Sequence, residues 1–79
     1  SQDAALFDET LEENLLLGRT GVDPARLAAA LADAGVTDFV TGLPQGLATP
    51  AGPRGSALSG GQRQRIAIAR ALLADAPVL

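Results

Sequence analysis

The first half of the chain opens with a short helix pattern that carries its own start and stop signals. Thr10 and Glu13 form a T-x-x-E capping box, in which the hydroxyl and the carboxylate satisfy two exposed N–H groups at a helix start. Gly18 is suited to the left-handed conformation that ends many helices. The pattern predicts a first helix of about two turns. Its apolar stripe consists of Leu11, Leu15 and Leu16.

A second helix pattern follows, and its start signal is clearer. Asp23 is the predicted cap, and Pro24 occupies the first helical position, where its missing N–H costs nothing. Apolar residues then recur at helical spacing until Gly35 ends the pattern. These apolar residues are Leu27, Leu31 and Ala34.

The middle of the chain loses this regular spacing. Residues 37–43 are predicted to add one or two turns that carry Phe39 and Val40 inward and end at Pro44. From residue 44 to residue 57, proline and glycine are frequent and no periodicity is visible. This stretch is therefore predicted to be a long ordered loop without a helix or a strand.

The last helix pattern begins with a second capping box, formed by Ser59 and Gln62. We expect the helix to end at Pro77, and residues 78–79 to open a buried strand that the chain does not finish. One face carries Ile66, Ala69 and Leu73, with Ala67, Arg70 and Ala74 beside it. The predicted fold is all-α, with three to four helices and a long Gly/Pro-rich loop before the last one.

Composition supports a small helical unit and excludes several kinds of site. The chain has 79 residues, enough for one small domain, and Ala is the commonest of its apolar residues. With two Phe as the only aromatic residues, the core must use Leu, Ile, Val and Ala, which favours packed helices. Cys and His are both absent, which excludes a disulfide, a Cys/His zinc site, and nucleophilic or imidazole catalysis by these residues.

The net charge is -3, and all of the basic residues are arginines. This acidic total argues against non-specific binding of nucleic acid. We expect Arg63, Arg65 and Arg70 to lie on a solvated or interdomain face. The start of the chain lacks the features of a signal peptide, and the most apolar run, residues 66–73, is short and interrupted by Arg70. The composition is typical of a soluble helical segment in the cytosol.

Two consecutive glycines, Gly60 and Gly61, stand at the start of the last helix. Such glycines cost backbone entropy, but they let a ligand approach bare N–H groups without a Cβ in the way. The helix dipole places partial positive charge there, so a phosphate is the natural ligand. The alternative interpretation of a bare Ser-Gly-Gly is an ordinary helix start with flexible glycines.

The sequence that contains these glycines resembles a known family. Residues 58–72 match the signature motif of ATP-binding cassette (ABC) ATPases, L-S-G-G-Q-R-Q-R-x-A-I-A-R-A-L. Residues 1–3 resemble the Q-loop, residues 10–18 resemble the exporter-type T-x-x-E-N-I-x-x-G, and residues 38–47 resemble the D-F-I-x-x-L-P-x-G-Y region. Residues 78–79 fall where the Walker B strand would begin. The resemblance implies that residues 1–79 are the helical signature subdomain of an exporter-like nucleotide-binding domain.

The resemblance also implies roles for individual residues. The first turn of the last helix would complete an ATP site in trans by closing on the γ-phosphate of ATP held by a partner domain. The residues concerned are Ser59, Gly60, Gly61 and Gln62. Gln62 also serves the capping box. Gln2 matches the Q-loop glutamine that reaches Mg²⁺ and the attacking water; the alternative is an ordinary polar residue near a chain end.

A further set of residues matches positions that contact the membrane domain in this family. They are Phe7, Gly52, Arg54 and Gly55. Phe7 has two interpretations, a core anchor or part of a groove that receives a coupling helix. The exporter-type loop T-E-V-G-E-R-G has acidic residues where this chain has Pro50 and Pro53, which removes two charges and stiffens the backbone.

The family's Walker A loop, Walker B Asp, catalytic Glu and switch His match nothing in this chain, and Lys is absent altogether. We therefore expect these residues alone not to hydrolyse ATP and to be a fragment of an ATPase that uses ATP and Mg²⁺. The implied partners are a second nucleotide-binding domain, in a homodimer or heterodimer, and the coupling helices of a transmembrane domain, but not nucleic acid. The implied location is the cytoplasmic face of the plasma (inner) membrane.

Two other functions remain open on the sequence. One is the helical subdomain of a soluble ABC ATPase that acts on nucleic acid or in translation. The other is a free-standing helical interaction module without a nucleotide. Residues 10–18 and the pair Arg54 and Gly55 favour the exporter over the first alternative, and the unfinished strand weakens the second.

Overall fold

A computed structural model describes residues 5–74 of the chain. Its helices are α1 (Leu11–Leu16), α2 (Pro24–Asp33), α3 (Val36–Val40) and α4 (Gly60–Ala74). Two 3-10 turns, η2 (Gly46–Ala48) and η3 (Pro53–Gly55), lie between α3 and α4. No strand occurs in this described range, which confirms the predicted all-α fold. The expected helix end at Pro77 and the start of a strand at residues 78–79 lie outside the described residues.

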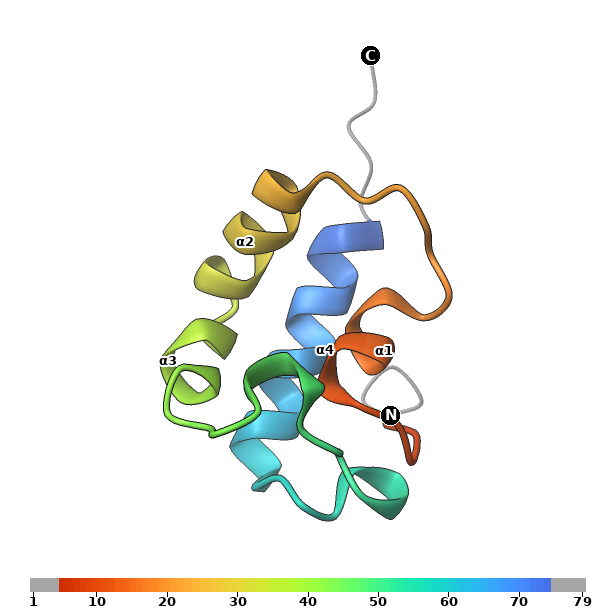
Figure 1. Cartoon of the computed structure of the whole chain (residues 1–79), viewed down its shortest axis with the longest axis vertical. Helices are drawn as coiled ribbons and strands as arrows, with labels where there is room; N and C mark the ends of the chain where they lie inside the picture. The colour runs from red at the N-terminus through yellow and green to blue at the C-terminus, as the bar shows by residue number, and fades with distance from the viewer. Residues whose placement is uncertain (1–4, 75–79) are drawn as a thin grey trace.

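Helix α4 is the central element of the fold. It packs against α1 on one side and against α2 and α3 on the other, while the segment with η2 and η3 crosses near its N-terminal end (Figure 1). The buried apolar face of α4 contains Ile66, Ala69 and Leu73, as the spacing predicted. The buried apolar residues around this face are all aliphatic. They include Leu6, Leu11, Leu15, Leu31, Ala34, Val36, Ala51 and Leu58.

Helix α1 forms where the capping box predicted it. The amide of Glu13 donates to the hydroxyl of Thr10 at 3.1 Å, and the amide of Thr10 donates to the carboxylate of Glu13 at 3.0 Å. The left-handed stop begins one residue earlier than expected, at Leu17 with φ 50°, and continues into Gly18 with φ 80°. A leucine in this region is uncommon, and it turns the chain sharply away from the helix.

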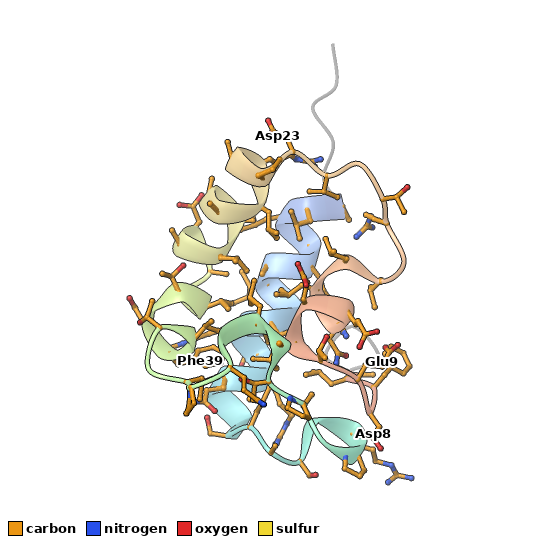
Figure 2. The ribbon with its side chains drawn as sticks, in the orientation of Figure 1. Asp8, Glu9, Asp23 and Phe39 are labelled. Carbon is orange, nitrogen blue, oxygen red and sulfur yellow. The ribbon has the colours of Figure 1, made fainter. Side chains whose placement is uncertain are left out.

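Helices α2 and α3 also begin close to the predicted positions. The side chain of Asp23 accepts from the amide of Ala25 at 3.1 Å, and Gly35 adopts the left-handed conformation with φ 77° between the two helices. Helix α3 is shorter than the predicted residues 37–43, which continue beyond it as hydrogen-bonded turns. Phe39 is half-buried against the core. The start of α2 at Asp23 lies at the opposite end of the molecule from Asp8 (Figure 2).

The Gly/Pro-rich segment is not free of secondary structure, so that part of the prediction was wrong. Short 3-10 turns need only one or two hydrogen bonds and leave no periodic pattern in a sequence. The segment is held against the start of α1 by an isolated antiparallel bridge between Thr10 and Pro50. The amide of Leu11 donates to the carbonyl of Thr49 at 2.9 Å, and the amide of Ala51 donates to the carbonyl of Glu9 at 2.8 Å. The loop is therefore fixed to the N-terminal segment.

Candidate functional site

The N-terminus of α4 is an exposed helix start with its capping box formed. The amide of Ser59 donates to the side-chain carbonyl of Gln62 at 3.0 Å, and the amide of Gln62 donates to the hydroxyl of Ser59 at 3.1 Å. Ser59, Gly60 and Gly61 are exposed, and Gln62 is half-buried. The capping box therefore fixes this turn while leaving its outer surface accessible.

The two glycines leave the same turn open to a ligand. In a helix that begins at Gly60, the N–H groups of Gly60 and Gly61 have no intrahelical acceptor, and none of the hydrogen bonds of residues 5–74 uses them. A Cβ at Gly61 would meet no described atom within 4 Å, and one at Gly60 would meet only the guanidinium of Arg63 at 3.7 Å. An anion can therefore approach these donors at the positive end of the α4 dipole.

The loop before α4 is packed directly beneath this helix start. A Cβ at Gly55 would lie 3.0 Å from the Cβ of Leu6 and 3.0 Å from the Cδ of Arg63, so a larger residue fits only if these neighbours shift. The guanidinium of Arg63 donates to the carbonyl of Leu58 at 2.8 Å, immediately before the capping residue. Gly55 thus contacts both the N-terminal segment and the first turn of α4.

The same loop holds an exposed arginine in an unusual conformation. Arg54 has φ 56°, and Gly52 and Gly55 on either side have φ 78° and φ 74°. A non-glycine residue in the left-handed region costs energy, and such residues are concentrated at functional sites. The backbone at Gly52 is also confined, because a Cβ there would lie 2.9 Å from the hydroxyl of Ser56. The loop therefore presents Arg54 to solvent on a tightly fixed backbone.

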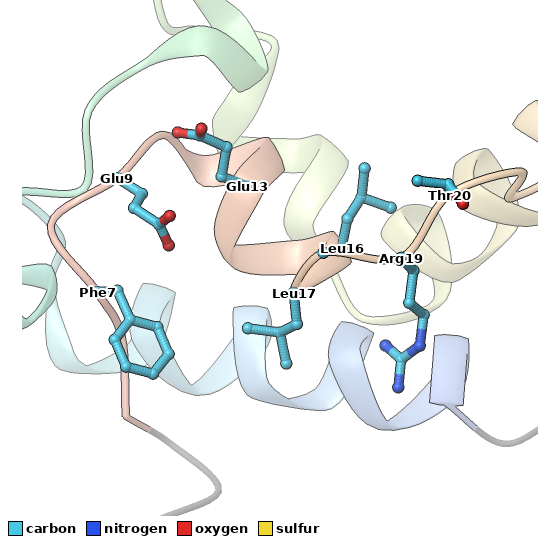
Figure 3. Close-up of a pocket in the computed structure, with 8 residues that line it drawn as sticks. Phe7, Glu9, Glu13, Leu16, Leu17, Arg19 and Thr20 are labelled. Carbon is cyan, nitrogen blue, oxygen red and sulfur yellow. The ribbon is translucent and has the colours of Figure 1, made fainter.

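Phe7 belongs to a groove and not to the core, and the groove is lined largely by apolar atoms but also by Glu9 and Glu13. Its side chain is 53% exposed, so the core-anchor interpretation was wrong, because the aliphatic core is already filled by leucine and alanine side chains. Phe7, Leu17 and Arg19 project on the side that faces α4 (Figure 3). The sequence reasoning missed Leu17, which is 46% exposed. Two adjoining hollows, which share Phe7, Leu17 and Arg19, form this groove, and α4 contributes Ala67, Arg70, Ala71 and Ala74.

The expectation of a solvated or interdomain arginine face was wrong for Arg70, which is only 8% exposed. Its Nε donates to the backbone carbonyl of Asn14 at 2.7 Å, and its Nη2 donates to the Oδ1 of Asn14 at 2.9 Å. Its Nη1 donates to the carbonyl of Ala5. Burial lowers the pKa of the Arg70 guanidinium from its usual value, while the carboxylate of Glu9 opposes that shift. An arginine remains charged at neutral pH even so.

The sequence reasoning also missed Asn14, which is fully buried in α1. A signal was present, since a polar Asn directly follows the capping box and precedes Leu15 on the inward face of the helix.

Gln2 lies outside the described residues. Within residues 5–74, no cluster of acidic, His or Cys side chains could hold a metal ion. Among the described helices, none combines the length and apolar character needed to cross a membrane.

Comparisons with known proteins point to one family. The family model described as ABC transporter matches residues 1–79. The chain is 56% identical over its whole length to an ATP-dependent lipid A-core flippase of Bordetella pertussis, and 51% identical to a protein of the same name from Saccharophagus degradans. A solved structure of a bacterial Atm1-family ABC exporter with ATP bound superposes on 96% of the chain with a TM-score of 0.83 and 46% identity.

These proteins are much longer than the chain. It spans 13% of the Bordetella flippase, 14% of the Saccharophagus flippase and 13% of the Atm1-family exporter chain. The similarity to the solved structure extends to the fold as well as the sequence, because both the TM-score and the identity are high.

Proposed function

Because the chain belongs to the ABC transporter family, we propose that it is the helical signature subdomain of a nucleotide-binding domain in a membrane exporter. The relatives described above are exporters or flippases, which favours this proposal over a soluble ABC ATPase. The family match also argues against a free-standing interaction module. On this proposal, residues 1–79 supply one part of an ATPase whose remaining motifs lie elsewhere.

The observation that carries the proposal is the exposed, glycine-lined N-terminus of α4. In the proposed arrangement, ATP is held by a second nucleotide-binding domain, and the first turn of α4 closes on its γ-phosphate. The turn offers the N–H groups of Gly60 and Gly61 and the hydroxyl of Ser59, with Gln62 holding the capping box in place. Fixed donors of this kind stabilise developing negative charge because they need not reorganise during the reaction.

A second surface is proposed to contact the transmembrane domain. It comprises the groove at Phe7 and Leu17 and the loop that contains Gly52, Arg54 and Gly55. The apolar groove suits a helix with an apolar face, and Arg54 suits a polar or acidic group beside it. The exposed prolines at positions 50 and 53 leave the loop without the acidic residues typical of this family, so its contacts would be less charged.

The remaining parts of the proposal concern the cofactors, partners and location. ATP and Mg²⁺ are the proposed cofactors of the complete protein, with Gln2 near the metal. The proposed partner is a second nucleotide-binding domain, identical or different, and the proposed location is the cytoplasmic face of the inner membrane. A nucleic-acid partner is not proposed, because Arg63 and Arg70 direct their guanidinium groups to carbonyl oxygens of the chain itself.

The test is a charge placed at the proposed phosphate site in the full-length protein that carries this sequence. Gly60→Asp sets a carboxylate against the phosphate, and at about 4 Å the repulsion is about 4 kcal/mol, or roughly a thousandfold in ATP turnover. ATP binding is expected to persist, because the nucleotide is held mainly by the other domain. An acidic residue in the first turn favours the helix, so folding should be retained.

Two matched variants separate charge from bulk and position. Gly60→Asn has the same size without the charge and is expected to lose less activity than Gly60→Asp. Gln64→Asp adds the same charge at an exposed position one turn further along α4 and is expected to keep nearly full turnover. Turnover is measured as phosphate release, and ATP binding is measured on the same preparations. Near-normal turnover in Gly60→Asp would refute the proposed contact with the γ-phosphate.

A further inference from the structure

The structure contains a buried polar network that the functional proposal does not use. Asn14 in α1 and Arg70 in α4 lie 56 residues apart in the sequence and bond directly to each other. Asn14 is 0% exposed and Arg70 is 8% exposed. Burying the charged guanidinium of Arg70 costs free energy unless its donors are satisfied by hydrogen bonds.

The network connects three segments through uncharged oxygen atoms. Arg70 donates to both carbonyl oxygens of Asn14, backbone and side chain, and to the backbone carbonyl of Ala5. Asn14 in turn accepts from the amide of Phe7 at 2.8 Å and donates to the carbonyls of Phe7 and Thr10, both at 3.0 Å. The N-terminal segment, α1 and α4 are therefore held in one arrangement by two side chains.

The same network forms part of the apolar groove. The guanidinium carbon of Arg70 lies 5.9 Å from the centre of the Phe7 ring, within the range of a cation–π contact. Arg70 also lines the groove together with Phe7 and Leu17. A partner that displaces the Phe7 ring or the backbone at Phe7 would therefore change the hydrogen bonds of Asn14 and Arg70.

Helix α4 connects this network to the phosphate-facing turn. Arg70 lies ten residues beyond Gly60 on the same uninterrupted helix, a distance of about 15 Å. A helix packed on several sides moves as a rigid body, so a shift at Arg70 is carried to Gly60 and Gly61. The first turn of α4 is held to the loop before it by the hydrogen bond from Arg63 to the carbonyl of Leu58, so the shift is shared with that loop, while Ser59, Gly60 and Gly61 remain exposed.

We propose that Asn14 and Arg70 are positioning residues that transmit the docking of a partner helix at the Phe7–Leu17 groove to the phosphate-facing turn of α4. This inference rests on the proposed function, because it assigns the coupling between its two surfaces to one buried contact. Arginine is suited to this task, because its planar guanidinium bonds two oxygens of one residue at fixed angles, whereas lysine offers a single charged point.

The test is a double-mutant cycle on ATP turnover by the full-length protein in vesicles of phosphatidylethanolamine and phosphatidylglycerol. Leu17→Ser weakens docking at the groove, and Arg70→Lys keeps the charge but loses the two-point contact with Asn14. Each single variant is expected to lower kcat about tenfold, with KM for ATP changed less than twofold. In the double variant, kcat is expected to fall less than twofold below that of either single variant, because both changes interrupt the same coupling.

Arg65→Lys is the matched control, since Arg65 is an exposed arginine on the same helix with one long hydrogen bond of 3.4 Å to Gly35. In the Arg65→Lys background, Leu17→Ser should still lower kcat about tenfold. If Arg70→Lys does not yield protein that binds ATP, Asn14→Ala replaces it, because it removes the side-chain oxygen that accepts from Arg70, and the same result of the cycle is expected.

Three results are distinguishable. If Leu17→Ser lowers kcat as much in the Arg70→Lys background as in the Arg65→Lys background, the two losses are independent. Arg70 would then have a structural role only, and the inference would be overturned. Unchanged kcat in Leu17→Ser would overturn it as well, because no coupling would then start at the groove. Retained turnover in Gly60→Asp would refute the proposed function itself, whatever the cycles give.

Discussion

Replacing Gly55 with alanine is expected to lower the free energy of unfolding by about 2–5 kcal/mol, through two separate effects. The first is conformational: Gly55 has φ 74°, and a residue with a Cβ in the left-handed region costs about 1–2 kcal/mol. The second is steric: the new Cβ would lie 3.0 Å from the Cβ of Leu6 and 3.0 Å from the Cδ of Arg63.

The steric effect is not easily relieved, because neither neighbour can move freely. The Cβ of Leu6 is fixed by the backbone of a buried residue, and the side chain of Arg63 is held by its hydrogen bond to the carbonyl of Leu58. Forcing an extra methyl group into such a site costs about 1–3 kcal/mol. Arg63 would have to shift away, which would loosen the loop from the first turn of α4.

Gly18→Ala is the matched control. Gly18 has φ 80°, but a Cβ there would meet no atom of the described residues within 4 Å. This variant should therefore show the conformational cost alone, about 1–2 kcal/mol. The small gain from restricting the unfolded chain is the same for both substitutions and cancels in the comparison.

The assay is urea unfolding followed by far-ultraviolet circular dichroism, with the midpoint and the slope fitted for each variant. At about 0.05–0.15 kcal/mol per residue, 79 residues correspond to a total stability of about 4–12 kcal/mol, so the loss in Gly55→Ala should appear as a large displacement of the midpoint. Equal losses for Gly55→Ala and Gly18→Ala, within about 0.5 kcal/mol, would refute the argument that Gly55 is required by close packing.

Two further predictions concern the helix starts. Thr10→Ala should lower the free energy of unfolding by about 0.5–2 kcal/mol in the same urea assay, because it removes the hydroxyl that caps α1. Thr20→Ala, at an exposed position outside the helices, should stay within about 0.5 kcal/mol of the unchanged chain, and a similar loss in both would contradict the capping argument. Gly61→Ala should leave stability unchanged or raise it by up to about 1 kcal/mol, because its Cβ enters open space at the start of a helix. If the proposed function holds, it should nevertheless reduce ATP turnover by the full-length protein at least tenfold, and normal turnover would count against close approach of a phosphate.

The helix starts were predictable because their signals are local. Thr10 with Glu13 and Ser59 with Gln62 bond across three residues, and Asp23 bonds the amide two residues later. Such contacts form whenever the chain enters a helix, so the residue types alone indicate the position. The glycines at the start of α4 were likewise visible in the sequence, and the structure leaves them exposed.

The course of the loop before α4 was less predictable. Its 3-10 turns lie on either side of the bridge between Thr10 and Pro50, which joins segments forty residues apart. The first left-handed residue after α1 is Leu17 and not Gly18. Conformational preference indicated the kind of turn but not its exact residue.

By itself, the sequence determined the helical class, the capped starts of α1, α2 and α4, the apolar face of α4 and the two glycines at its start. Tertiary structure alone decided that Phe7 lies exposed in a groove while Arg70 is buried against Asn14. The reason is that helical spacing gives the face on which a residue lies but not what covers that face. A long arginine is solvated or buried according to the acceptors that other segments bring to it, and here those acceptors come from 56 residues away.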